Sequence, residues 1–207
     1  MRVAVIGASG RTGRTTIKHA LAAGMDVVSI VRNPSSAPEG TTVAQADARD
    51  REALAAGVKG ADAVVSCLGQ VAGDQDLTVL QGGATALVAA MTSVGVSRLV
   101  VVSSAGAFVA GDDPLSRFVA KPILARVFRA YYEDTRAMEA VIRASDTSWT
   151  LLRPSRLIAG NGKARYRSSL DVSVRWHYTT AFDTVGRAAV DAVSKPGWAG
   201  HAVFITE

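Results

Sequence analysis

The stretch "VIGASGRTGR", residues 5–14, decides the fold of this chain, because three glycines spaced by three follow a run of small aliphatic residues. Gly7, Gly10 and Gly13 stand where a buried strand would end and a helix would begin. Glycine permits a tight turn and lets an anion approach the backbone without a Cβ atom in the way. The first N–H groups of a helix are free to bind that anion. The stretch therefore predicts a strand, an anion-binding turn and a helix.

The same alternation of strand and helix continues to the end of the chain. Short runs rich in Val, Ile, Leu and Ala occupy residues 2–7, 26–32, 41–47, 62–69, 98–104, 148–154 and 201–207. Because these runs lack strict alternation of apolar and polar residues, they indicate parallel strands covered on both faces. Helix-like segments such as 15–24 and 80–95 lie between them and end in glycine. The pattern predicts an α/β fold with a Rossmann-type doubly wound parallel sheet.

Composition limits the class of protein. A chain of 207 residues, 48% hydrophobic and 20% charged, is expected to form a single domain over residues 1–207. It has no apolar run long enough for a membrane span and no leader-like start, so we expect a soluble, cytoplasmic protein without a membrane partner. One cysteine excludes an internal disulfide. The net charge is +5, but the basic residues are scattered, so no nucleic-acid partner is expected. The three histidines lack metal-ligand spacing, so no metal site is expected.

The position of the glycine triplet, after the first strand of an alternating chain, favours a dinucleotide as its ligand. A nucleoside triphosphate loop is disfavoured because the sequence lacks G-x-x-x-x-G-K-[ST]. The pyrophosphate is expected to lie against the whole turn, which comprises Gly7, Ala8, Ser9, Gly10, Arg11, Thr12 and Gly13.

The end of the second strand indicates which dinucleotide is bound. An acidic residue there would bind the ribose 2′-hydroxyl of NAD, whereas a cation would bind the 2′-phosphate of NADP. Arg32 occupies this place without an acidic neighbour, and Arg11 is expected to face the same phosphate. We therefore predict NADP(H). Asp47, followed by Ala48, either accepts from the adenine amino group or caps a helix beginning near Arg49.

The later strand ends are expected to line the nicotinamide half of the cofactor site, through Cys67, Leu68 and Gly69, and through Ser103 and Ser104. Two irregular segments, 106–122 and 155–181, would lie over the same edge of the sheet. The second is expected to be a small, hairpin-like excursion on the substrate side. Within it, apolar residues at 172, 174, 176 and 178 alternate as one face of a half-buried strand would. Alternatively, residues 176–178 line the wall of an acceptor site.

Several stretches together carry a resemblance to a known family. These are the glycine turn, "VRNPSS" (31–36), "QADARD" (45–50), "VVSSAGAF" (101–108), "RAMEAVIRAS" (136–145) and "SWTLLRPSRL" (148–157). The whole chain resembles the atypical short-chain dehydrogenase/reductases with an NAD(P)H-binding domain, which include NmrA-like proteins and biliverdin-IXβ/flavin reductases. The resemblance implies that Ser104 lies beside the nicotinamide and that Pro154 lies near its carboxamide.

The sequence departs from the larger superfamily at its catalytic pair. Typical members carry Tyr-x-x-x-Lys, which places both side chains on one helix face, where the cation lowers the pKa of the phenol. The matching stretch here is "YYEDTRAMEA" (131–140), so Tyr131 takes the place of the tyrosine and Thr135 that of the lysine. The usual interconversion of alcohol and ketone is therefore disfavoured. The candidate catalytic residues are Ser104 and Tyr131.

Two functions remain open from sequence. The first is an NADPH-dependent reductase that transfers hydride to a planar conjugated acceptor such as a flavin, a quinone or a linear tetrapyrrole, because conjugation spreads the arriving charge. The alternative is a non-catalytic NADP(H)-binding redox sensor of the NmrA-like type. An epimerase or dehydratase is disfavoured, because these enzymes normally retain the tyrosine and lysine pair. The chain is expected to be a monomer or a homodimer.

Overall fold

A computed structural model describes residues 1–70, 78–163 and 165–207. Ten strands are present in these residues: β1 (Arg2–Ile6), β2 (Asp26–Val31), β3 (Thr42–Gln45), β4 (Ala63–Ser66), β5 (Arg98–Val102), β6 (Ser148–Pro154), β7 (Arg156–Ile158), β8 (Arg167–Leu170), β9 (Thr179–Ala181) and β10 (His201–Thr206). The α-helices of the same residues are α1 (Arg11–Ala22), α2 (Arg51–Val58), α3 (Val79–Val94), α4 (Lys121–Val127), α5 (Arg129–Arg143) and α6 (Phe182–Val193). All seven predicted strands are confirmed.

The main sheet has the order β3-β2-β1-β4-β5-β6-β10-β8, in which the first seven strands are parallel and β8 runs antiparallel to β10. The chain reverses direction across the sheet between β3 and β4, which leaves β1 and β4 as neighbours. This arrangement confirms the predicted doubly wound fold. In such sheets, ligands bind outside the carboxyl ends of the strands at the point of reversal.

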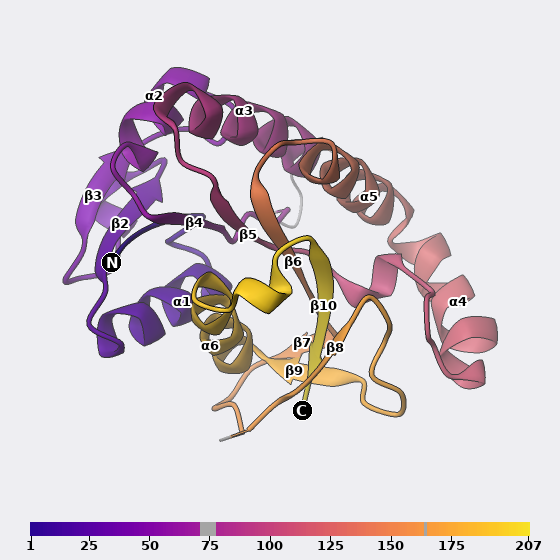
Figure 1. The fold of residues 1–207 in the computed structure, drawn as a ribbon. Helices are drawn as coiled ribbons and strands as arrows, with labels where there is room; N and C mark the ends of the chain where they lie inside the picture. The colour runs from indigo at the N-terminus through magenta and orange to yellow at the C-terminus, as the bar shows by residue number, and fades with distance from the viewer. Residues whose placement is uncertain (71–77, 164) are drawn as a thin grey trace.

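Helices cover both faces of the sheet (Figure 1). On β1, Ala4 and Ile6 pack into the core under α2, α3 and α5, whereas Val3 and Val5 pack into the core over α1 and α6. Successive strand residues point to opposite faces, so an apolar residue is required at every position of a strand covered on both sides. This explains why the strand runs are apolar without alternation.

The segment 155–181 differs from the predicted hairpin. Its strand β8 joins the edge of the main sheet, while β7 and β9 pair in parallel as a separate two-stranded sheet. The predicted strand over residues 172–178 is wrong. Trp176 adopts a left-handed φ of 63° and is 61% exposed, so its alternation with the neighbouring apolar residues does not reflect a sheet face.

Two features bear on membrane and metal partners. No helix in the described residues is long and apolar enough to cross a bilayer. The same residues contain no group of three or more His, Cys, Asp or Glu side chains placed to hold a metal ion.

Candidate functional site

The glycine turn between β1 and α1 has the geometry of an anion site. Gly7 takes a φ of +73°, and a Cβ atom there would lie 2.7 Å from the carbonyl oxygen of Cys67, so only glycine fits. A Cβ atom on Gly10 would contact only the Gly7 oxygen, at 3.3 Å, and would otherwise point into open space. Among the described residues, no side chain caps α1 and no acidic residue lies in its first turn. The turn therefore fits a pyrophosphate.

A cavity of about 320 Å³ lies over this turn. We call it the glycine-loop cavity. Its walls come from the carboxyl ends of β1, β2, β3 and β4, and from Val79 at the start of α3. The cavity brings together the predicted residues Gly7, Ser9, Gly10, Arg32, Asp47, Ala48, Cys67, Leu68 and Gly69.

The predicted residues Ala8, Thr12 and Gly13 lie beside this cavity without lining it. Ala8 and Gly13 are buried beneath the turn. The Thr12 carbonyl oxygen accepts hydrogen bonds from the hydroxyl groups of Thr15 and Thr16. Ala8, Thr12 and Gly13 therefore help to shape the turn.

The arginines near the cavity are not arranged as the sequence predicted. Arg32 lines the cavity, is exposed, and its guanidinium has no protein partner in the described part of the chain. Arg11 instead lies with its guanidinium 4.4 Å from the ring centre of Phe182, on the side of α1 that faces α6. Arg14, three residues later, donates to the carbonyl oxygens of Ser9 and Ser36, each at 3.0 Å. Arg11 is held against Phe182 of α6, so the α1 guanidinium that reaches the segment after β2 is that of Arg14.

The two interpretations of Asp47 are separated by the structure. Helix α2 begins at Arg51, and its cap is Asp50, whose carboxylate accepts from the N–H of Ala53 at 3.0 Å. The Asp47 carboxylate accepts from the N–H of Arg49 at 2.9 Å and lines the cavity. Asp47 is therefore not the cap of α2.

Cys67 is not a reactive thiol. Burial raises the pKa of Cys67 to about 12, and the hydrogen bond with Thr16 lowers it only in part. The thiol stays protonated at neutral pH, so Cys67 acts as a small apolar side chain in the cavity wall.

A buried charged network joins the ends of β5 and β6, and the sequence analysis did not find it. Glu139 of α5, only 2% exposed, accepts from the hydroxyl of Ser103 at 2.6 Å and from Nε of Arg153 at 3.0 Å. The Arg153 guanidinium also lies 3.4 Å from the ring centre of Phe108. Arg153 within the apolar run "SWTLLRP" was the available signal, because a charge on a buried strand requires a partner.

The residues predicted near the nicotinamide occupy different positions around this network. Ser103 points its hydroxyl at Glu139, and Pro154 is buried in β6, so neither side chain lines a cavity. Ser104 follows β5 and is partly exposed. Its hydroxyl has no hydrogen-bond partner in the described residues, so it is available to a ligand.

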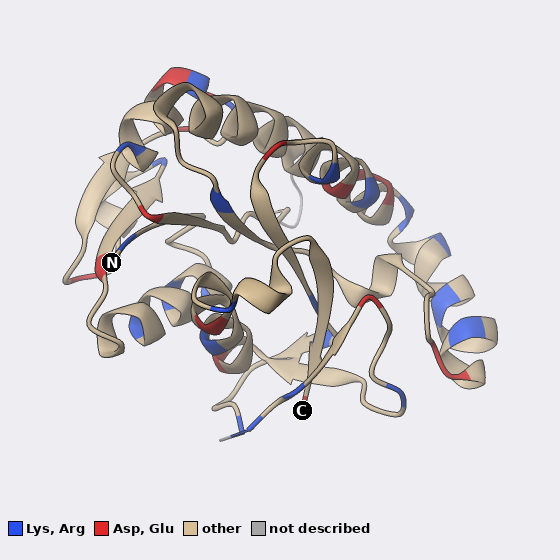
Figure 2. Ribbon diagram, viewed as in Figure 1, with Lys and Arg blue, Asp and Glu red and all other residues tan. Residues whose placement is uncertain are grey.

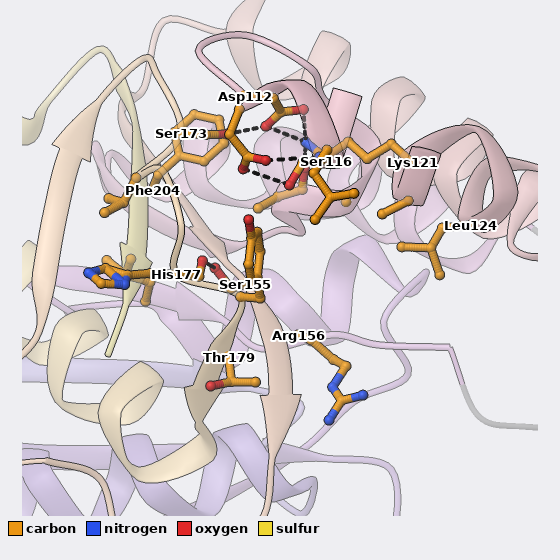
Figure 3. Close-up of a pocket in the computed structure, with 18 residues that line it drawn as sticks. Asp112, Ser116, Lys121, Leu124, Ser155, Arg156, Ser173, His177, Thr179 and Phe204 are labelled. Atoms are coloured by element: carbon orange, nitrogen blue, oxygen red, sulfur yellow. Dashed lines mark hydrogen bonds and ion pairs between the residues drawn. The ribbon is translucent and has the colours of Figure 1, made fainter. Parts of the chain in front are cut away.

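A second cavity, of about 480 Å³, lies over the ends of β5, β6 and β10 (Figure 3). We call it the outer cavity. Because β4 pairs with β5 and β5 with β6, it is next to the glycine-loop cavity along the same sheet edge. Ala105 and Gly106, directly after Ser104, form part of its wall, so Ser104 precedes a segment that lines this cavity.

The charged groups of the outer cavity are mostly paired with one another. Asp112 accepts from Nζ of Lys121, with a closest approach of 2.6 Å, and from the hydroxyl of Ser173 at 2.7 Å. Asp113 accepts from the N–H and the hydroxyl of Ser116. Arg156 is exposed, and its guanidinium has no partner in the described residues. Apart from Arg156, the wall therefore offers a ligand mainly apolar surface, including Leu124 and Phe204.

Lys121 links several segments of this wall. Besides the ion pair with Asp112, its ammonium group donates to the carbonyl oxygens of Ala105 and Phe108. Burial lowers the pKa of Lys121, which the bond and the charge of Asp112 oppose. The segment after β5 and the segment around Ser173 are thereby joined over the cavity.

The three residues predicted as a possible acceptor wall lie in different places. His177 and Tyr178 line the outer cavity, whereas Trp176 does not. The core-packing interpretation of the same stretch is wrong, because Trp176 and Tyr178 are exposed to solvent.

The tyrosine at the family's catalytic position does not reach either cavity. Tyr131 packs against the core under α3, and burial raises the pKa of its phenol. Thr135, at the lysine position, is fully buried and donates to the Tyr131 carbonyl oxygen at 2.7 Å. The neighbouring Tyr132 instead packs its ring against Gly106. Consecutive helix residues point about 100° apart, so only one of the two can face that loop.

The two acids beside these tyrosines have different partners, and Asp134 caps a helix other than its own. Glu133 pairs with Arg129 on the helix surface at 2.9 Å. Asp134, 5% exposed, accepts from the N–H groups of Leu80 and Gln81, each at 2.9 Å, and so caps α3.

Comparison with known proteins identifies relatives of this chain. The Bacillus subtilis protein YwnB is 30% identical over 164 residues, which cover 79% of this chain and 76% of YwnB. The Mycobacterium tuberculosis protein Rv2047c is 40% identical over 105 residues, which are 50% of this chain and only 12% of that much longer protein.

Solved structures share the fold at lower identity. A protein from Burkholderia pseudomallei matches with a TM-score of 0.85 and 24% identity, covering 100% of both chains. ChuY, an anaerobilin reductase from Escherichia coli O157:H7, matches with a TM-score of 0.79 and 19% identity, covering 100% of this chain and 97% of ChuY.

The family model described as NAD(P)H-binding matches residues 7–196, which include the glycine turn, most of the lining of both cavities and the buried network of Glu139 and Arg153. The chain therefore belongs to the NAD(P)H-binding family.

Proposed function

We propose that this protein is an NADPH-dependent reductase that passes hydride to a planar conjugated acceptor. The observation that carries the proposal is the pair of neighbouring cavities on one sheet edge, one with a glycine turn and a free arginine and the other mainly apolar. Reductases occur among structures of the same fold, and ChuY is one of them. The enzyme would work in the cytoplasm on a small molecule.

The glycine-loop cavity would hold the adenosine half and the pyrophosphate of NADP(H). Gly7, Gly10 and the start of α1 would bind the pyrophosphate, and Asp47 would accept from the adenine amino group. Arg32 would bind the 2′-phosphate, together with Arg14, whose guanidinium lies beside Ser9 and Ser36. Planar guanidinium groups match phosphate oxygens through paired hydrogen bonds.

When bound, NADPH supplies a hydride, and the acceptor takes a further proton from solvent. Ser104 would orient the ring edge between the two cavities, because its hydroxyl has no protein partner among the described residues. His177, Tyr178 and Phe204 would hold the acceptor ring in the outer cavity, where Arg156 faces its polar edge. Alignment of two rings in this way lowers a barrier by roughly 7–11 kcal/mol.

The position of the tyrosines supports a conjugated acceptor over an alcohol or ketone. Neither tyrosine of α5 lines a cavity, and Thr135 supplies no cation. The usual route, in which a tyrosine and lysine pair on this helix protonates an alkoxide, would therefore be unavailable, and a positioned acid supplies about 10² to 10⁴ in rate to such a step. A conjugated acceptor does not need that acid.

Calorimetry tests the cofactor assignment. NADPH should bind at least tenfold more tightly than NADH, which corresponds to about 1.4 kcal/mol. Arg32→Ala should remove most of this difference. Arg11→Ala is the matched control and should change it less than twofold, since Arg11 lies over Phe182. Equal affinity of the wild-type protein for both coenzymes would disprove the NADPH assignment.

The rival function is a redox sensor, which the threonine in place of lysine at position 135 also favours. Oxidation of NADPH, followed by its absorbance with flavins, quinones and a linear tetrapyrrole, separates the two. A reductase turns over at least one acceptor, and Ser104→Ala lowers that rate while Tyr131→Phe leaves it within about twofold. Binding of both redox forms without turnover of any acceptor would favour the sensor.

A further inference from the structure

An apolar surface without a partner lies on the helical segment that covers the outer cavity. Leu115, Phe118, Val119, Ile123 and Val127 form this surface, which we call the apolar ridge. Phe118 is 70% exposed, Val127 69% and Ile123 62%. Monomeric soluble proteins rarely expose so many large apolar side chains in one contiguous patch, and such patches mark protein or membrane contacts.

An ordinary surface helix packs its apolar side against the protein. In this helical segment the apolar side faces solvent instead. This helical segment consists of a π-helix (Ser116–Ala120) followed by α4, and Leu115, Val119, Ile123 and Val127 recur along it at every fourth residue, on one side. The side that faces the protein is instead anchored by polar groups. Ser116 donates to Asp113, and Lys121 donates to Asp112 and to backbone oxygens. The sequence therefore uses its polar side to hold the helix and leaves its apolar side to solvent.

The exposed charges on the helical segment that carries the ridge are all basic. Residues 114–132 contain no Asp or Glu, and Figure 2 shows Lys and Arg but no acidic residue on α4. Arg117 and Arg126 are exposed and have no acidic partner in the described residues. Two ridges packed about a two-fold axis would bring these like charges together, which disfavours a second copy as the occupant. A surface that is both apolar and anionic would match the apolar and the basic side chains of this segment.

The ridge is also next to an opening of the outer cavity. Leu115 and Leu124 both line that cavity and are themselves 53% and 38% exposed. Figure 1 shows α4 at the margin of the molecule, beyond the main sheet, and Figure 3 shows Leu124 and Lys121 on the helical side of the cavity. A flat surface in contact with the ridge would therefore lie near this opening.

We propose that the apolar ridge docks on an anionic lipid membrane, with the helical segment in the headgroup region and the outer cavity opening toward the bilayer. Amphipathic helices with aromatic and aliphatic residues on one side and Lys or Arg beside them bind membranes in this way without crossing them. The expectation of no membrane partner rested on the lack of a spanning segment, which this mode of binding does not need. The acceptor would be a lipid-soluble quinone, an assignment that rests on the proposed function.

Flotation of the full chain with vesicles tests the docking. Binding should be at least tenfold greater on vesicles of phosphatidylcholine with about 30% phosphatidylglycerol than on phosphatidylcholine alone, and it should weaken as salt increases. Ile123→Ser with Val127→Ser should reduce binding at least tenfold, as should Arg117→Glu with Arg126→Glu.

Matched variants elsewhere on the surface act as controls. Val43→Ser removes an apolar side chain that is 45% exposed on β3, and Arg51→Glu with Lys59→Glu reverses two exposed charges around α2. These variants should bind like the wild type. The docking proposal is overturned if anionic vesicles show no excess binding, or if the controls weaken it as much as the ridge variants. A wild-type dimer that Ile123→Ser with Val127→Ser converts to monomer, without vesicle binding, would assign the ridge to a second copy instead.

A second arm tests the acceptor. Each turnover consumes one NADPH and one proton and converts one quinone to its hydroquinone. Ile123→Ser with Val127→Ser should lower the rate at least fivefold with a long-chain quinone embedded in anionic vesicles and leave it unchanged with a short-chain soluble quinone. Equal rates for the variant and the wild type on the embedded quinone would overturn the assignment of a lipid-soluble quinone as the acceptor. No NADPH oxidation with any acceptor would refute the proposed function, while flotation still decides the docking.

Discussion

The glycine-loop cavity and the outer cavity lie on one sheet edge but are assembled from different kinds of sequence. The walls of the first come from residues 6–79, mainly from the residues at and just after the ends of four strands. The backbone of the turn after β1 forms part of these walls. The second takes its walls from residues 105–124, 155–179 and 204–205, which are held together by side chains. A site made of backbone depends on local sequence, whereas a site made of side-chain pairs depends on which loops meet. Changes to single side chains should therefore affect the outer cavity more.

The largest expected effect comes from the network that supports both cavities. Glu139→Ala leaves the Arg153 guanidinium buried without its carboxylate, so the free energy of unfolding should fall by about 3–5 kcal/mol. Urea unfolding measures this loss. Glu133→Ala on the same helix is the control and should cost less than about 1 kcal/mol, because the pair between Glu133 and Arg129 is exposed. Equal losses in the two variants would show that burial of the network contributes nothing.

A smaller effect should separate the two cavities. Lys121→Met leaves Asp112 with the Ser173 hydroxyl as its remaining side-chain donor, so the loops over the outer cavity should loosen and stability should fall by about 1–3 kcal/mol. The KM for the acceptor should rise at least tenfold, while the Kd for NADPH changes less than twofold. Steady-state kinetics and calorimetry measure the two constants. Lys59→Met, an exposed change on the other side of the molecule, should alter neither. An equal loss of NADPH affinity in Lys121→Met would contradict the independence of the cavities.

The smallest expected effect concerns the contact between α1 and α6, which lies outside both cavities. The hydrogen bond from Lys18 holds the pKa of Asp183 below its ordinary value of 3.8, and the charge of His19 acts in the same direction. The ionised carboxylate therefore stabilises the fold above that pH, and this stabilisation is lost as the pH falls through the lowered pKa.

Asp183→Asn should accordingly cost about 0.5–1 kcal/mol at pH 7, a modest value because Lys18 is largely exposed. The difference from wild type should shrink as the pH falls below 3.8 and through the lowered pKa of Asp183, because the wild-type carboxyl then becomes protonated. Thermal unfolding at several pH values measures it. A difference that does not change with pH would assign the effect to packing.

Much of the fold could be predicted because its signals are local. The apolar runs identify the seven parallel strands, and the triplet of Gly7, Gly10 and Gly13 identifies the first turn. The segment 155–181 could not be predicted, because its strands are fixed by pairing with other segments. Strand β8 pairs with β10, which is distant in sequence, and β9 pairs with β7 across a long loop. Alternation at residues 172–178 indicated a strand, but those residues form a loop at the outer cavity.

The candidate site divides in the same way. Arg32, Asp47 and Gly69 line the glycine-loop cavity, because each lies within three residues of the end of a strand. Arg11 and Tyr131 do not line a cavity, because each side chain's direction depends on the helix packed against it, α6 for Arg11 and α3 for Tyr131. Helix phase relative to a neighbour is a property of packing, which spacing in one segment cannot supply.

By itself, the sequence determined the order of strands and helices, the glycine turn and the lack of lysine at position 135, because these depend on the conformational preferences and chemistry of adjacent residues. Only the tertiary structure decided that Glu139 binds Arg153, that Lys121 joins the loops over the outer cavity, and that the apolar side of residues 115–127 faces solvent. These outcomes depend on contacts between distant segments, and burial and pairing of charge exist only once those segments have been brought together.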